Sequence, residues 1–406
     1  MDVFAKCSQV PIGKELEASS FGAHRRVLQS GPGAEVVVDG RAMLMLGSGD
    51  YLGLAGDARV KRAAAGALEL WGTSSAGCAL EATFDLQLEL ERSLARFLRC
   101  DGAVVYGSGY LAGLGVISTL AGPGDVLVIE RRAHASILDG SALSGAEVKR
   151  FRHDEPGDLE RVMDGCGEAG TLVVVEGVHG LEGDVAPLPR IVRACRDRGA
   201  RLVLDDTHGM GVLGRGGRGT AEHFDLEDEV DVVMGSTGAA LAGPGGFAAA
   251  GRTVIDFLRD TRSNRPLLFA SSPSPAALAA VQAALGIAEA EPGLRSRLWT
   301  ITERVHRALR GMGLDAGPSR TPIVALPAGP LERACELWRA LTAEGLFVHA
   351  VLPPAVPSSR CRIRITLTAS LADGQVDRLL AILEERSTRS GGAGGAPGVA
   401  AARRAG

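Results

Sequence analysis

Side chains that can carry acid–base chemistry follow three apolar runs of this sequence. Glu176 and His179 come after TLVVV. Asp205 and His208 come after RLVL, and Ser236 follows DVVMG. Imidazole titrates near neutral pH and a carboxylate can pair with a cation or accept a proton, so this set suits proton transfer. Ligands of an open parallel sheet bind beyond the carboxyl ends of its strands, so we expect these side chains to converge on one crevice.

The apolar runs have the composition of strands that are buried on both faces. Between about residues 56 and 320 the sequence contains GAVVYGSG, DVLVIE, GTLVVVEG, ARLVLDD and VDVVMGS, each followed by a stretch of helical periodicity. Continuous runs of valine and leucine are typical of parallel strands covered by helices. The pattern therefore predicts an α/β large domain over residues 56–320, built on a doubly wound, mostly parallel sheet.

Two further parts and a tail complete the predicted organisation. Residues 1–55 read as an N-terminal arm that leads into two short strands within AEVVVDGRAMLMLG. Residues 321–386 alternate TPIVALPAG, FVHAVLPPAV and CRIRITLTAS with helical patterns, which predicts an α+β C-terminal domain with an antiparallel sheet. Residues 387–406 are rich in Gly, Ala and Pro and cannot bury a core, so we expect a disordered tail.

The composition excludes several classes of protein. A net charge of −4 offers no basic footprint for nucleic acid. No stretch approaches the roughly 18 uninterrupted apolar residues of a membrane span, and the first residues lack the apolar core of a signal peptide. The seven cysteines include no CxxC pair, so we expect reduced thiols in a cytoplasmic protein and no metal site.

Eight motifs occur in order between about residues 30 and 385. They are MLGSGDYLGL, YGSGYLAGLGVISTLAGPGD, HASILDG, EGVHGLEGDVAPLP, LDDTHGMGVLGRGGRG, GSTGAALAGPGGF, RPLLFASS and RIRITLTAS. Together they resemble the α-oxoamine synthase family of pyridoxal phosphate (PLP) enzymes, which includes 8-amino-7-oxononanoate synthase, serine palmitoyltransferase, 5-aminolevulinate synthase and 2-amino-3-ketobutyrate CoA ligase. The resemblance implies the type I fold of PLP-dependent transferases and a homodimer whose active site lies at the subunit interface.

The resemblance implies roles for three side chains around the cofactor ring. His134 would stack on the pyridine ring, Asp205 would pair with the ring nitrogen, and His208 would contact the ring hydroxyl. A carboxylate beside the pyridine nitrogen keeps it protonated and makes the ring an electron sink. The alternatives are that Asp205 caps a helix and that each histidine is a structural residue.

The resemblance also implies a phosphate cradle and a carboxylate site. Backbone amides around Ser108, Gly109 and Tyr110 would hold the phosphate at a helix N-terminus, where exposed N–H groups favour an anion. Ser236 would add a hydroxyl, and a second subunit would donate Ser271. The alternative for this segment is a plain strand-to-helix turn.

Arg362 and Arg364 alternate with apolar residues, which places both on one face of a strand. By the resemblance, one of the two would hold a substrate carboxylate. A solvated sheet edge is the alternative. Sequence alone does not choose between the two arginines.

The anchoring lysine of the family is missing from this chain. The family loop that carries the imine-forming lysine aligns with STGAALAGPGGF without a gap and places Ala239 at the lysine position. No lysine follows Lys149. A methyl group cannot form an imine or move a proton, so the usual covalent cycle of the family is ruled out.

Other departures surround this loss. Gly49 stands at a position where the family has Asn, Ala79 replaces Arg, and Gln87 replaces His. In EGVHGLEGD, His179 and Gly180 replace an aromatic residue and a serine. We hypothesise that His179 acts with His134 or His208 as a general base; a packing or surface histidine is the alternative.

Three functions are compatible with these residues. The first is an acyltransferase of specialised metabolism, which would move an acyl group from a CoA or carrier-protein phosphopantetheine thioester to a nucleophile. PLP would then be held without a covalent bond, if it is bound at all. The second is a catalytically inactive subunit that completes the pocket of a lysine-bearing homologue. The third is an engineered lysine-to-alanine variant.

Overall fold

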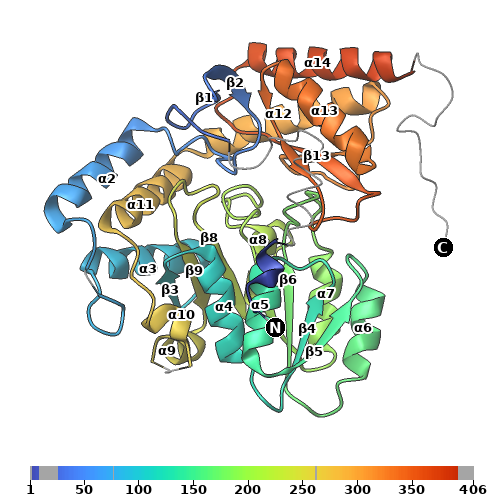
Figure 1. Ribbon diagram of the computed structural model, residues 1–406. Helices are drawn as coiled ribbons and strands as arrows, with labels where there is room; N and C mark the ends of the chain where they lie inside the picture. Colours follow the sequence, from blue (N-terminus) through green and yellow to red (C-terminus); the bar gives the residue numbers. More distant parts are fainter. Residues whose placement is uncertain (1, 9–25, 76, 261–262, 392–406) are drawn as a thin grey trace. The chain divides into compact units, whose positions relative to one another are not determined.

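The computed structural model divides into two compact units (Figure 1). The large unit comprises Gly49–His179 and Val185–Ser296, and the small unit comprises Met1–Ser48, Gly180–Asp184 and Arg297–Gly406. The boundary between Ser296 and Arg297 falls within helix α12 (Pro292–Gly311). The structure describes residues 2–8, 26–75, 77–260 and 263–391.

The domain boundaries predicted from the sequence, after residues 55, 320 and 386, stay predictions. The two strands expected near the end of the arm are present as β1 (Glu35–Val38) and β2 (Arg41–Met45). Helix α14 (Asp373–Gly391) continues past residue 387, where the tail was expected to begin. Residues 9–25 of the expected arm and 392–406 of the expected tail lie outside the described residues.

A seven-stranded sheet forms the centre of the large unit (Figure 1). Its order is β3-β9-β8-β7-β6-β4-β5; β9 is antiparallel to both β3 and β8, and the other neighbours are parallel. The mostly parallel, doubly wound sheet predicted from the sequence is therefore confirmed. The strands are β3 (Gly102–Tyr106), β4 (Val126–Glu130), β5 (Glu147–Phe151), β6 (Thr171–Glu176), β7 (Arg201–Asp205), β8 (Val232–Ser236) and β9 (Gly246–Ala250).

Two of these strands, β5 and β9, carry no strong strand signal in the sequence. The residues of β5, EVKRF, include three charged side chains, because an edge strand leaves much of its surface in water. The residues of β9, GFAAA, are small and have little strand propensity. Pairing on both sides and complete burial hold β9 in place, so tertiary packing overrides local preference there.

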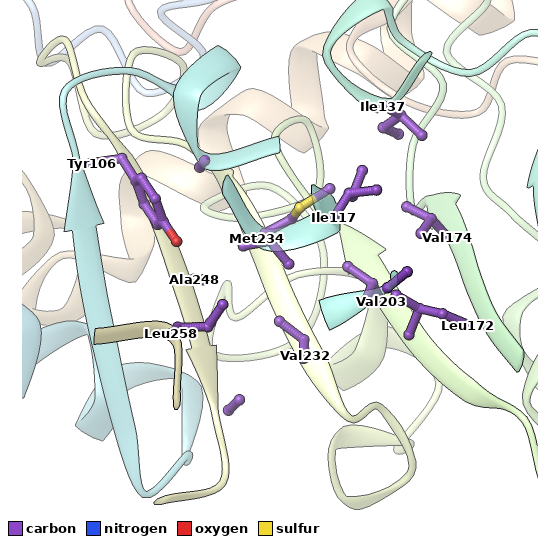
Figure 2. Packing of buried hydrophobic residues seen from close by; sticks show 14 of the residues in the cluster. Tyr106, Ile117, Ile137, Leu172, Val174, Val203, Val232, Met234, Ala248 and Leu258 are labelled. Atoms are coloured by element: carbon purple, nitrogen blue, oxygen red, sulfur yellow. The ribbon is translucent and has the colours of Figure 1, made fainter. Parts of the chain in front are cut away.

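Helices cover both faces of the sheet and bury them in separate clusters. Val174 of β6 packs in one cluster with Ile117 and Ile137, which belong to α4 and α5 (Figure 2). Val173 and Val175 point to the opposite face and pack in the second cluster with side chains of α6 and α7. Because successive strand residues alternate between two dry faces, the run must be apolar throughout, as the sequence indicated. Each such aliphatic side chain contributes about 1.5–3 kcal/mol on burial.

Short connections join the strands to the helices of the large unit. No helix in the described part of the chain is long and apolar enough to cross a membrane. The helices of this unit are α2 (Ala58–Trp71), α3 (Asp85–Leu98), α4 (Gly109–Leu120), α5 (Ala135–Ser144), α6 (Pro156–Asp164), α7 (Leu188–Arg196), α8 (Thr220–His223), the 3-10 helix η2 (Glu227–Glu229), α9 (Arg252–Asp260), α10 (Arg265–Leu268) and α11 (Pro275–Ala290).

The small unit contains two three-stranded sheets. One has the order β1-β2-β11, and the other, β10-β13-β12, is antiparallel throughout. The antiparallel sheet of the α+β part is thus as the sequence predicted. The remaining elements are η1 (Ala5–Ser8), β10 (Ile323–Gly329), α13 (Leu331–Ala343), β11 (Leu346–Phe347), β12 (His349–Val351), β13 (Cys361–Thr366) and α14.

Candidate functional site

Asp205 ends strand β7 at the carboxyl edge of the large sheet. Its Oδ1 accepts hydrogen bonds from the Thr207 hydroxyl at 2.7 Å and from the Thr207 amide at 3.1 Å. Protein surrounds the carboxyl group, and this desolvation raises its pKa, while the two Thr207 bonds and nearby His134 act in the opposite direction. A desolvated carboxyl with a raised pKa is a site that a positively charged partner stabilises.

Thr207 connects Asp205 to Ser236 on the neighbouring strand, β8. The Ser236 amide donates to the Thr207 hydroxyl at 2.9 Å, while that hydroxyl donates to Asp205. One threonine therefore holds two predicted site residues through the two roles that a hydroxyl can play. The sequence reasoning missed Thr207, although its position directly after the strand-end DD pair was a usable signal.

His208 is held by a tyrosine that the sequence reasoning also missed. The Tyr51 hydroxyl and His208 Nδ1 lie 2.8 Å apart, and the two rings meet edge to face with centroids 6.0 Å apart. Tyr51 is buried and belongs to the motif MLGSGDYLGL, so its ring gives His208 a rigid support. The contact involves Nδ1, and proton exchange with a ligand therefore falls to Nε2.

His134 stands exposed at the start of α5, where its position is set by its backbone. Its amide donates to Glu176 Oε1 at 2.8 Å, and its Nδ1 lies 2.8 Å from the Ser136 hydroxyl. Tyr110 contacts the His134 ring edge to face at 6.1 Å, and the Tyr110 hydroxyl donates to Asp139. Glu176, a predicted strand-end residue, is thus a support for His134 in this structure.

The start of α4 and the end of β8 approach so closely that glycine is required between them. Ser108 caps α4 by accepting from the Leu111 amide at 3.2 Å. A Cβ atom at Gly109 would lie 2.5 Å from the Ser236 Cβ, and a Cβ at Gly246 would lie 2.3 Å from the Ser108 carbonyl oxygen. The first amides of a helix have no intrahelical partner, so this junction presents N–H groups next to the Ser236 hydroxyl.

Ala239 lies in the loop between β8 and β9, three residues after Ser236. Its methyl group is buried, with 6% of the residue exposed. A Cβ atom placed on Gly49 would lie 3.8 Å from the Ala239 Cα and 3.9 Å from its Cβ. Gly49 and Ala239, two positions at which the sequence was expected to depart from the family pattern, are therefore neighbours.

The remaining predicted residues of the large unit, His179 and Ser271, make contacts of their own. His179 is buried, its Nε2 lies 3.2 Å from the Arg132 carbonyl oxygen, and its ring packs on His153 with centroids 4.7 Å apart. Ser271 is exposed, and its backbone forms an isolated antiparallel β-bridge with that of Cys78 in the same chain. Donation of Ser271 by a second subunit stays a prediction.

The two arginines of β13 have different surroundings in the small unit. Arg362, which is partly buried, forms an ion pair with buried Glu182 at 2.7 Å. Arg364 lines a cavity of about 550 Å³, and no described carboxylate forms an ion pair with it. His349 lies opposite Arg364 on β12, where burial, and then the charge of Arg364, lowers the pKa of the imidazole. Arg364 is therefore the better candidate for a substrate carboxylate.

We expect Arg362→Met to affect stability and Arg364→Met to affect substrate binding. The first leaves Glu182 buried without this guanidinium and should lower the free energy of unfolding by about 3 kcal/mol. The second breaks no ion pair among the described residues, so it should change stability by less than about 1 kcal/mol and instead raise KM for a carboxylate-bearing substrate. Urea unfolding and steady-state kinetics measure the two effects, and equal destabilisation by both variants would contradict the assignment.

Comparison with known proteins agrees with this architecture. The family model for aminotransferase class I and II matches residues 41–383. The chain is 40% identical over 349 residues to serine palmitoyltransferase of Caulobacter vibrioides, covering 85% of this chain and 86% of the other. It is 40% identical over 362 residues to 8-amino-7-oxononanoate synthase of Geobacter sulfurreducens, covering 88% and 92%.

Solved structures of serine palmitoyltransferase superpose on the chain over nearly its whole length. The Sphingomonas wittichii enzyme has a TM-score of 0.91 at 32% identity, covering 96% of this chain and 99% of the other. A lysine-to-alanine variant of the S. paucimobilis enzyme, with a bound PLP–myriocin aldimine, has a TM-score of 0.91 at 31% identity with the same coverage.

The sheet, the glycine-lined junction and the strand-end carboxylate define a transferase of the type I PLP fold, in the aminotransferase class I and II family. Within that class, the chain belongs to the α-oxoamine synthase family, as its motifs indicated.

Proposed function

We propose that the protein is an acyltransferase that moves an acyl group from a CoA or carrier-protein thioester to a nucleophile, with PLP held without a covalent lysine. One observation carries the proposal. Thr207 and Tyr51 hold Asp205 and His208, whereas the buried methyl of Ala239, the residue that the resemblance aligns with the family's lysine, lies beside Gly49. Loss of function altogether would not require Thr207, Tyr51 and Glu176 to keep holding these side chains.

The residues of the large unit fit PLP. The amides that begin α4 and the Ser236 hydroxyl suit the phosphate, and the desolvated Asp205 suits a protonated pyridine nitrogen. His134 is exposed, and Glu176 holds its backbone amide, so its ring is available to stack on a cofactor. When bound, PLP supplies an electron sink for a carbanion.

His208 and His134 are the proposed proton carriers. A nucleophile that attacks the thioester carbonyl loses a proton as its new bond to the acyl carbon forms, and the C–S bond then breaks. His208 Nε2 can accept that proton and return it to the departing thiolate, while Tyr51 holds Nδ1. The Nε2 of His179 lies 3.2 Å from the Arg132 carbonyl oxygen, and the part of His179 as a general base stays a prediction.

Support for non-covalent cofactor binding comes from the S. paucimobilis relative. Its lysine-to-alanine variant holds a PLP–myriocin aldimine, so a member of this fold retains PLP bonded to an amine ligand when a lysine has been changed to alanine. The same arrangement is available to the present chain, in which an amine nucleophile could bind to PLP directly.

A homodimer is part of the proposal. Leu80 and Phe269 expose 61% and 58% of their surfaces, and the Leu80 amide donates to the Leu268 carbonyl at 3.3 Å, so the two apolar side chains share one region. Exposed Ser271 follows Phe269 by two residues. Burial of this region against a second copy would bring Ser271 to an interface, as expected from the family resemblance.

The test is release of thiol from palmitoyl-CoA by the purified chain, supplied with L-serine or a pool of amino acids, before and after addition of PLP. We expect turnover with PLP and at least about a 100-fold lower rate for His208→Asn. His223→Asn, at an exposed histidine at the end of α8, is the matched control and should leave the rate unchanged. Sedimentation equilibrium on the same sample gives the oligomeric state.

The two competing functions predict other outcomes. Turnover that requires a lysine-bearing homologue would identify the chain as an inactive partner subunit. No thiol release under either condition would overturn the acyltransferase proposal. A native gene that encodes lysine at position 239 would identify the engineered variant.

A further inference from the structure

The cavity of the small unit is lined by two arginines, of which one is already committed. Its volume is about 550 Å³, within the range of roughly 300–1,000 Å³ that is usual for small-molecule sites. Arg26 donates from Nε to Asp39 Oδ2 at 2.8 Å, and its guanidinium lies 5.7 Å from the centroid of the Trp338 ring. Arg364 Nε is buried and makes no hydrogen bond within the described part of the chain. Arg364 is therefore the arginine that can serve a ligand.

His349 lines the same cavity from the neighbouring strand. It is the partner of Arg364 in the antiparallel pair of β12 and β13, so the two side chains project from one face of the sheet. The Cβ atoms of such directly opposite residues lie about 4.5–5.5 Å apart. No hydrogen bond joins the His349 ring to a residue in the described ranges. An imidazole and a guanidinium thus stand side by side in the cavity wall.

The position of the imidazole is set by packing. The rings of Phe347 and His349 meet edge to face with centroids 6.1 Å apart. Gly47 packs against both, because a Cβ atom there would lie 2.9 Å from Phe347 Cδ1 and 3.2 Å from His349 Cδ2. A side chain at position 47 would push the two rings away. Neither contact consumes a ring nitrogen of His349.

The His349 imidazole is mostly neutral at pH 7. Desolvation, and then the charge of Arg364, lowers its pKa. In either tautomer a neutral imidazole has one N–H group and one lone pair, and the lone pair pairs with a hydrogen-bond donor. A guanidinium offers only donors and suits a carboxylate. The cavity therefore presents a hydrogen-bond acceptor next to a carboxylate-binding group.

Much of the rest of the cavity wall is apolar. No carboxylate side chain of the described residues lines the cavity, so none competes there with a ligand for Arg364. Apolar surface of a ligand that is buried against such a wall contributes about 25 cal/mol per Å². The apolar lining residues include Phe347, Val351, Leu352, Pro353 and Pro354.

We propose that this cavity binds a 2-hydroxy or 2-amino acid with an apolar side chain, with Arg364 on the carboxylate and His349 accepting from the adjacent hydroxyl or amine. The inference rests on the proposed function, since it names the class of the nucleophile that receives the acyl group. His349 is a specificity-determining residue. An acid without a donor beside its carboxylate leaves the imidazole lone pair unpaired when it displaces water.

Two substitutions at position 349 form a matched pair. His349→Phe keeps a flat ring to pack on Phe347 but has no lone pair, whereas His349→Gln keeps an acceptor oxygen. Arg364→Met removes the partner of the carboxylate. His223→Phe, at an exposed histidine at the end of α8, is the control for loss of a histidine elsewhere.

The experiment is calorimetric titration of the full-length protein, without PLP or thioester, with mandelate and with phenylacetate, which lacks only the hydroxyl. We expect mandelate to bind about 10-fold more tightly, because phenylacetate leaves the acceptor unpaired. Phenylglycine tests the amine in the same way. His349→Phe should bind both acids equally, and His349→Gln should keep a preference of about 3-fold or more. Arg364→Met should bind both acids about 10-fold more weakly or worse, and His223→Phe should match the wild type.

The proposal is overturned if the wild-type protein binds neither mandelate nor phenylglycine, if it binds them no better than phenylacetate, or if folded His349→Phe keeps the preference. Melting curves show whether each variant is folded, and His349→Ala, which also lacks an acceptor, replaces a phenylalanine variant that does not fold. The titration contains no thioester, so its failure leaves thiol release from palmitoyl-CoA unaffected. Selective binding of mandelate without thiol release would instead overturn the acyltransferase proposal alone.

Discussion

Ala239→Lys is expected to convert the protein into one that carries covalent PLP, with one cofactor per chain that survives dialysis and becomes permanent on borohydride reduction. Ala239 follows Ser236 by three residues at the end of β8, and its methyl is in contact range of the position that a Gly49 side chain would occupy. An amine at this position can reach the aldehyde of PLP if the loop has the geometry of its relatives. The absorbance spectrum and the mass of the labelled peptide measure the change.

Ala239→Met is the matched control, because methionine has nearly the same length as lysine and no amine. It should bind PLP no more tightly than the wild-type protein and give no reducible adduct. Both variants must be shown to be folded by their melting temperatures, since position 239 is buried. A folded lysine variant that binds PLP but forms no adduct at position 239 would show that this residue does not face the cofactor.

Asp205→Asn is expected to weaken PLP binding by about 100-fold or more. Removal of one partner from a desolvated charge pair costs about 3–5 kcal/mol, and each 1.36 kcal/mol is a factor of ten in affinity. Asparagine keeps the shape and can still accept from Thr207, so the effect isolates the charge that faces the ring nitrogen. Equilibrium dialysis with PLP measures it, and an unchanged affinity would remove Asp205 from the cofactor site.

The same substitution should stabilise the cofactor-free protein. Desolvation raises the pKa of Asp205 above its usual value in the folded state, so the folded protein binds this proton more tightly than the unfolded chain. Such a group destabilises the fold at neutral pH, and the penalty disappears as the pH falls toward the unfolded pKa near 4. The melting temperature of Asp205→Asn without PLP should therefore exceed that of the wild type at pH 7, and the difference should shrink toward pH 4.

An Asp205→Asn protein that is less stable than the wild type at pH 7 would mean that the carboxylate is a structural residue, as the helix-cap alternative holds. The pairing of weaker binding with greater stability is typical of a side chain retained for function, because its environment is unfavourable until the ligand arrives.

The sequence predicted most of the strands that carry this site, but not the residues Thr207 and Tyr51 that hold its side chains. Strands that are buried on both faces need apolar residues such as valine and leucine throughout. This pattern can be recognised in the sequence alone. Strand β9 escaped notice because its alanines are held by pairing on both sides. Thr207 and Tyr51 escaped because a hydroxyl near a functional residue has no distinctive spacing until its partner is known.

What the sequence by itself determined is the family, the mostly parallel sheet and the positions at which strand ends deliver functional groups, since these depend on local composition and on motifs in order. Only the tertiary structure decided that Arg362 is committed to Glu182 while Arg364 lines a cavity, and that His179 packs on His153. Two arginines on one strand face, or two histidines far apart in the chain, look alike in sequence. Their chemistry differs because charge and lone pairs act over a few ångströms, between residues that only folding brings together.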